Sequence, residues 1–154
     1  MANTIENDTE FTIRSANKTL PLIRRIVEDI VVLSKRISDT RSRLEYLTEG
    51  RVESEEDLYS SELKAIEVAT EEESRMLDEF LRELLMLNVI PTSAHLGYVD
   101  FLARRENEQV CLCWKQGEKE VMHWHRIDED CSKRRLVDLP LIRQSGERQA
   151  TRPV

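Results

Sequence analysis

Hydrophobic residues recur at seven-residue intervals through the first third of the chain. Two such rows run in parallel and consist of Ile23, Ile26, Ile30, Leu33, Ile37, Thr40, Leu44 and Leu47. All of these eight positions except Thr40 are apolar. A period of about 3.5 residues predicts a long helix that presents one continuous apolar stripe. Thr12 can serve as its N-cap, Pro21 predicts a kink or restart near Leu20, and Gly50 is a natural stop.

A second helical pattern opens at Ser54, with acidic residues in its first turn. Its middle is thinly apolar, whereas its last three turns are apolar on more than one side around Phe80, Leu84 and Leu87. Each helix would be about 50 Å long at a rise of about 1.5 Å per residue. Matched lengths joined by a short linker predict an antiparallel helical hairpin.

The charges of the two helices support this hairpin. Residues 14–43 contain eight basic and three acidic residues, whereas residues 51–79 contain eleven acidic and three basic ones. A basic helix beside an acidic one complements it along their contact. If the hairpin folds about residue 51, Ile26 lies opposite Met76, and Arg36 faces the neighbourhood of Glu67.

Beyond Asn88 the pattern changes from helical to strand-like. Tyr98–Phe101 is typical of a short strand, and two further strands, Glu108–Trp114 and Glu120–Arg126, flank a turn that contains Gly117. The fold class is therefore α+β. The predicted domains are an antiparallel helical hairpin over 11–90, a small antiparallel β module packed on its base over 91–138, and a disordered tail over 139–154.

The register of the predicted β-hairpin decides which side chains share a face. A loop of two or four residues makes paired residue numbers add up to an odd value. Cys111 and Cys113 then lie with Trp124, on the face opposite His123 and His125. We expect this arrangement, with Val110, Leu112, Trp114 and Val121 facing the helices and His123 drawn inward, although a loop of three residues reverses it.

Composition narrows the classes of protein. Charged residues make up 34% of the chain and aromatic residues 5%, and glycine and proline occur four times each, which favours long helices. No window of about 18 apolar residues and no signal peptide is present, so we expect a cytoplasmic protein without membrane contact. The net charge of −7 argues against nucleic acid as a partner. Three cysteines predict free thiols rather than disulfides.

Five short motifs resemble a bacterial family, domain of unknown function 2203. They are FTIRSANKTLPLIR from Phe11, GYVDF from Gly97, CWKQGE from Cys113, WH from Trp124, and the arginine pair at 134 and 135. The resemblance covers residues 11–137 and implies no assigned activity. Family members usually show VDFPA, WHEL and GFAGR, where this chain has Leu102, Arg126 and the segment DCSKR.

Candidate chemistry is concentrated in the β module. A ligand or divalent metal site would be formed by Asp100, Glu118, His125, Arg134 and Arg135. His123 and His125 alternate on one strand, so both imidazoles share a face and would be the first candidates for a metal. A zinc site of Cys111, Cys113, His123 and His125 is a further alternative, which the odd register excludes. No cofactor is identified, and whether the protein is an enzyme stays open.

Two functional hypotheses follow from these features. The first is an assembly or adaptor protein whose helical hairpin dimerises or docks a protein partner. The predicted homodimer interface consists of Ile23, Ile30, Ile37 and Leu44, because the stripe of the first helix exceeds what the second can cover. The alternative is a small module that binds a ligand or a divalent metal through the polar residues of the β module.

Overall fold

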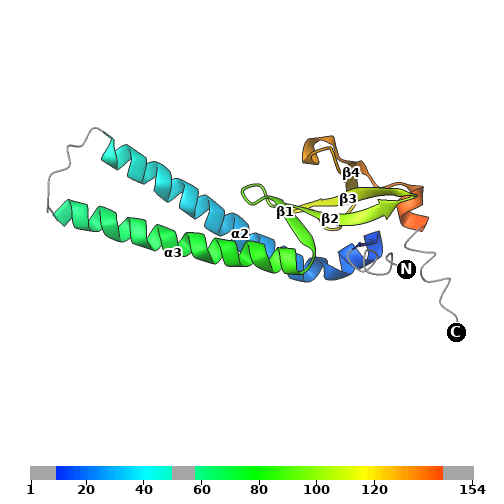
Figure 1. The fold of residues 1–154 in the computed structure, drawn as a ribbon, viewed down its shortest axis with the longest axis horizontal. Coiled ribbons are helices and arrows are strands. Elements are labelled where there is room, and N and C mark those ends of the chain that lie inside the picture. Colours follow the sequence, from blue (N-terminus) through cyan, green and yellow to red (C-terminus); the bar gives the residue numbers. More distant parts are fainter. Residues whose placement is uncertain (1–9, 50–57, 144–154) are drawn as a thin grey trace.

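The computed structural model describes residues 10–49 and 58–143. Two long helices precede a five-stranded antiparallel sheet in which neighbouring strands follow chain order (Figure 1). The α+β prediction is confirmed. The elements are α2 (Ile13–Thr48), α3 (Leu58–Met86), β1 (Val89–Ser93), β2 (Tyr98–Arg105), β3 (Glu108–Lys115), β4 (His123–Arg126), the 3₁₀ helix η1 (Cys131–Lys133) and β5 (Arg135–Leu136). Among the described residues, no helix is long and apolar enough to span a bilayer.

Helix α2 begins at the predicted cap. The Thr12 hydroxyl accepts a hydrogen bond from the Ser15 N–H at 3.1 Å, and the Thr12 N–H donates to the Ser15 hydroxyl at 2.8 Å. The predicted restart near Pro21 is wrong, because the helix continues through it. Pro21 lies on the exposed side of α2, where water can satisfy the freed carbonyl, while Leu20 and Ile23 anchor both flanks in the core.

The two helices form the predicted antiparallel hairpin, with a shifted register. Arg41 donates to the Ser74 hydroxyl at 3.2 Å, and Arg36 lies 3.9 Å from Glu73 rather than facing Glu67. These contacts place the centre of the hairpin near residue 56 instead of residue 51. The helices diverge toward that end (Figure 1). The predicted cap at Ser54 lies outside the described residues.

Strand β1 was not predicted, because Pro91 indicated only the end of a helix. It forms an edge of the sheet, where a residue without an N–H is tolerated. Strand β2 extends to Arg105, well beyond the predicted Phe101. A tight turn joins β2 to β3, and Glu106 adopts the left-handed conformation there with φ of 57°.

The predicted odd register between β3 and β4 is wrong. Cys111 pairs with His125, Leu112 with Trp124, and Cys113 with His123. A seven-residue connection, 116–122, replaces the expected tight loop, so the turn does not dictate the register. Burial dictates it instead: only this register places Trp124, rather than His123, on the apolar face.

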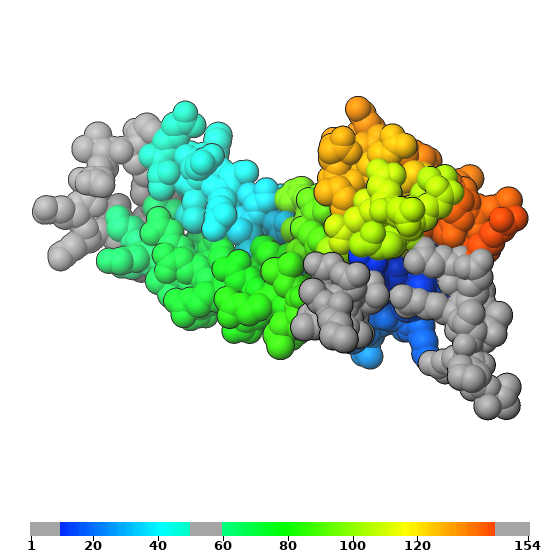
Figure 2. Space-filling view, turned by 45° about the vertical axis from the view of Figure 1, so that its right-hand side comes forward, coloured from blue at the N-terminus to red at the C-terminus, as the bar shows by residue number. Residues whose placement is uncertain are grey.

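The core lies between this apolar face and the helices. The face contributes Val99, Phe101, Val110, Leu112, Trp114 and Trp124, and the first half of α2 packs against it through Ala16, Leu20, Ile23, Val27 and Ile30. Leu84 of α3 is buried in the same cluster, as the sequence predicted. The sheet stands over the start of α2, while the far halves of both helices project away (Figure 2).

Three of the four predicted interface residues are buried within the chain itself. Ile23, Ile30 and Ile37 are 0%, 2% and 5% exposed, and Leu44 is half-buried. The first three therefore cannot form the predicted dimer interface. The β module covers much of the stripe, which removes the physical reason for a second hairpin at these positions.

The predicted disordered tail begins too early. Residues 139–143 form a short helix, and Leu141 is buried in the core. The N–H groups of Leu141 and Ile142 donate to the Asp138 carbonyl, each at 3.1 Å. The rest of the predicted tail, residues 144–154, lies outside the described residues.

Replacing Gly97 with alanine is expected to lower the free energy of unfolding by about 1 to 3 kcal/mol. An added Cβ would lie 2.8 Å from Gln116 Cβ, and Gly97 has a φ of +74°. Gly117→Ala is the matched control, because Gly117 also has a positive φ but no heavy atom within 4 Å of an added Cβ. Urea unfolding of both variants checks the difference, and equal losses would contradict the predicted clash.

Candidate metal centre

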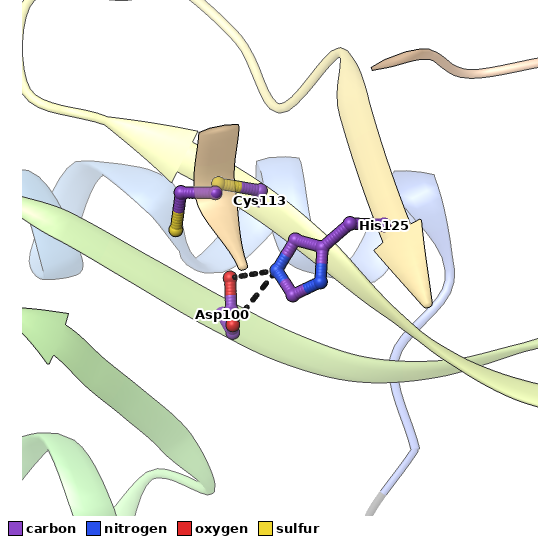
Figure 3. Close-up of side chains that lie close together, drawn as sticks. Asp100, Cys113 and His125 are labelled. Carbon is purple, nitrogen blue, oxygen red and sulfur yellow. Dashed lines mark hydrogen bonds and ion pairs between the residues drawn. The ribbon is translucent and has the colours of Figure 1, made fainter. Parts of the chain in front are cut away.

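Three potential metal ligands meet on the sheet face opposite the core. Asp100 on β2 pairs with Cys113 on β3, and His125 on β4 lies two residues beyond His123, the other partner of Cys113. Figure 3 shows the three side chains close together on neighbouring strands. Cys131 on η1 is the fourth. Their ligand atoms all lie within 4.8 Å of one another.

The residues of this cluster lie in the interior. Asp100 and His125 are only 4% and 2% exposed, Cys113 is fully buried, and Cys131 is half-buried. Transferring an ionised carboxylate from water to such a place is costly unless a cation or a hydrogen-bond donor compensates it. The cluster therefore needs positive charge or protons close to Asp100.

Hydrogen bonding assigns the orientation of the His125 ring. Nδ1 lies 2.7 Å from the Arg126 carbonyl oxygen, which can only accept, so Nδ1 carries a proton. Nε2 lies 3.0 Å from each carboxylate oxygen of Asp100. In a neutral ring whose proton is on Nδ1, Nε2 carries a lone pair. It then faces the two carboxylate oxygens of Asp100, which can only accept when the carboxylate is ionised. A proton or a metal ion between Nε2 and the carboxylate resolves this conflict.

Burial acts on the acid–base behaviour of the cluster. It raises the pKa of Asp100, and the hydrogen bond and charge of His125 offset this only in part. Burial likewise raises the pKa of the Cys113 thiol, and the nearby Asp100 charge adds to the effect. For Cys111 the same causes raise the pKa to about 12. A coordinated metal ion would favour the deprotonated cysteine instead, because it binds the thiolate rather than the thiol.

The structure selects a ligand set that differs from both sequence hypotheses. The even register brings Cys111, Cys113, His123 and His125 to one face, so the geometric reason for rejecting their zinc site was wrong. Only Cys113 and His125 of that set belong to the four-residue cluster, however. His123 instead lies beside Glu118, with its Nδ1 3.3 Å from a carboxylate oxygen.

The other predicted ligand-binding residues are distributed over two further places. Glu118 accepts two hydrogen bonds from Arg134, at 2.8 and 3.2 Å, and one from the Lys115 N–H at 2.7 Å. Arg135 pairs with Glu129 and stacks over the Trp124 ring at 4.5 Å. Of the predicted set, Asp100 and His125 belong to the four-residue cluster, and the Arg134 side chain interacts with Cys113 at its edge.

Sequence reasoning missed Cys131 as a member of this site. It follows Cys113 by 18 residues and matches no local spacing of zinc ligands. Its position depends on the turn after β4, where the Asp130 carboxylate caps η1 by accepting the Ser132 N–H. The only available signal was the presence of a third thiol in a polar segment.

Acidification is expected to reveal the contribution of Glu118 to stability. Burial would raise its pKa, but hydrogen bonds from Arg134 and the Lys115 N–H outweigh this and lower it. Glu118 therefore stabilises the fold above its unfolded pKa of about 4.3, and this stability is lost as the pH falls toward its lower folded pKa. In urea unfolding the wild type should lose more stability below this pH than Glu118→Gln does. If the free energy of unfolding fell equally with pH in the wild type and in Glu118→Gln, this prediction would be contradicted.

A comparison with protein families identifies the chain. The model of a family described as "Uncharacterized conserved protein (DUF2203)" matches residues 10–137. The chain belongs to the DUF2203 family. The match spans all the named helices and strands, and the whole four-residue cluster. Searches of curated proteins and of solved structures found no match. The family description names no activity for DUF2203 proteins.

Proposed function

We propose that this DUF2203 protein binds one zinc ion through Asp100, Cys113, His125 and Cys131. The observation that supports it best is the orientation of His125, which directs Nε2 to the Asp100 carboxylate at 3.0 Å while Nδ1 bonds to a carbonyl. Histidines that bind metals nearly always donate their other N–H in this way. Two thiols in the same cluster complete four donors, the number that zinc prefers.

The donor types favour zinc over other common ions. Thiolate and imidazole are poor ligands for magnesium and calcium, which prefer six or more oxygen ligands. A mixed set of two sulfurs, one nitrogen and one oxygen suits a tetrahedral ion such as zinc. The three sheet residues are held by strand pairing, so they need little rearrangement to coordinate it.

Elemental analysis of the purified protein tests this proposal. After incubation with zinc and desalting, we expect about one zinc ion per chain in the wild type. Cys113→Ala should lose most of it. Cys111→Ala is a matched control, because Cys111 is also buried on β3 and faces the same side but lies outside the cluster. A wild type without zinc, or equal loss in both variants, would refute the site.

A second proposal is that the far end of the hairpin docks a second copy of the chain. Tyr46, Ile66 and Val68 are exposed there, although they are large and apolar. Residues 35–48 of α2 contain four basic and two acidic residues, and residues 58–73 of α3 contain five acidic and one basic residue, so two copies would be complementary in charge. Light scattering should then give twice the chain mass of 18.1 kDa. A monomer at micromolar concentration would contradict it.

A further inference from the structure

A cavity of about 630 Å³ opens on the sheet face that carries the candidate metal centre. Asp100, His125 and Cys131 belong to its wall. Many of the remaining wall residues are apolar and come from β1, β2 and the flanking loops: Ile90, Leu96, Leu102 and Ile127. This size and composition are typical of sites for small molecules, which range from about 300 to 1,000 Å³. A zinc ion with four protein ligands has no open position, so a molecule in this cavity can reach the metal only by replacing one of them.

The two acidic residues of the wall outside the metal centre already have partners. Glu129 accepts hydrogen bonds from Arg135 and from the Arg126 N–H, at 2.6 and 2.9 Å. Asp130 accepts from the N–H of Ser132 at 2.9 Å. Both oxygens of Glu129 are therefore engaged, whereas Asp130 accepts through Oδ1 alone. A ligand that occupies this space meets apolar side chains, the polar residues Thr92, Tyr98 and Ser132, and, at one place, the metal centre.

Among the four donors, Cys131 is the one most easily displaced. The other three lie on adjacent, hydrogen-bonded strands and are buried. Cys131 lies on a three-residue 3₁₀ helix outside the sheet and is half-buried at the cavity wall. Zinc sites that exchange ligands keep three protein ligands and one open position. Displacement of Cys131 would produce that arrangement.

We infer that the cavity binds a small, largely apolar molecule with one anionic group that coordinates the metal in place of Cys131. The anionic group is of the carboxylate, thiolate or hydroxamate class, and the apolar body contacts the cavity wall. This inference rests on the proposed zinc site. It extends that proposal by naming the chemical class of the ligand and the protein group that leaves.

Cobalt replaces zinc in the test, because its visible absorption reports changes of coordination. The probes are benzohydroxamate, which has an apolar ring, and acetohydroxamate, which has only a methyl group. We expect both to alter the cobalt spectrum, and benzohydroxamate to bind at least about tenfold more tightly because its ring is buried. The cobalt content after desalting must stay unchanged, so that the spectrum reports binding rather than metal removal.

Three variants connect the cobalt spectrum to the cavity. Leu96→Asp should remove most of the preference for benzohydroxamate, whereas Leu85→Asp, a similarly exposed site on α3 outside the cavity wall, should keep it. Cys131→Ala should bind both probes more tightly, because no protein thiol competes for the fourth position. Cobalt bound with a spectrum that neither probe changes would overturn this inference alone. Equal binding of both probes would also overturn it. Failure to bind cobalt would overturn the metal site itself.

Discussion

Supplying zinc to chelator-treated protein is expected to raise its free energy of unfolding by about 4 kcal/mol when free zinc is about a thousand times its dissociation constant. The reason is linkage, since zinc binds the folded arrangement of four donors that are far apart in the unfolded chain. Binding of zinc to cysteines of the unfolded chain would reduce the gain. Urea unfolding followed by circular dichroism, with zinc and with chelator, measures it.

The matched cysteine variants make this expectation specific. Cys113→Ala should unfold at the same denaturant concentration with and without zinc, whereas Cys111→Ala should keep most of the gain. Both side chains are buried on the same strand, so the general cost of truncation is similar. A wild type whose unfolding midpoint does not depend on zinc would contradict the linkage.

Replacing Trp114 with alanine is expected to lower the free energy of unfolding by about 3 to 5 kcal/mol. Trp114 is fully buried in the core, and its ring N–H donates to the Glu118 carbonyl at 3.0 Å. The substitution therefore opens a large cavity and also breaks the bond that holds the connection before β4. Equilibrium unfolding in urea measures the loss.

Two further variants separate the causes of this loss. Trp114→Phe keeps an aromatic ring but removes the N–H, so it should cost clearly less than the alanine variant. Met86→Ala truncates a large side chain that is 78% exposed at the end of α3, and it should change stability by no more than about 0.5 kcal/mol. A small effect of Trp114→Ala, similar to that of Met86→Ala, would show that the sheet does not depend on this contact.

The helices were the most predictable part of the fold. The cap at Thr12 and the apolar stripe of α2 are local patterns, and local hydrogen bonding and periodicity are enough to determine them. Which elements of the chain pack against this apolar stripe was not predictable from the same local patterns. Ile23 and Ile30 belong to a cluster that includes the sheet as well as α3, and a helical period does not reveal what will cover it.

In the β module, too, the pattern within a single strand was predictable, whereas the pairing between strands was not. The alternation of side chains along one strand predicts that His123 and His125 share a face. It does not predict which residues of β3 lie on that face. A loop of two or four residues predicts an odd register, whereas the real connection of seven residues allows either register. The preference of Trp124 and Leu112 for the core then determined the pairing.

The sequence by itself determined the two helices and the small β module, and it predicted that Asp100 and His125 belong to one polar site. Only the tertiary structure decided that Cys113 and Cys131 join them, that Arg134 binds Glu118 and interacts with Cys113 at the edge of the cluster, and that Arg135 pairs with Glu129 instead. The physical reason is that a metal centre depends on distances between side chains from separate strands and turns. Those distances follow from strand register and core packing, which are properties of the whole chain.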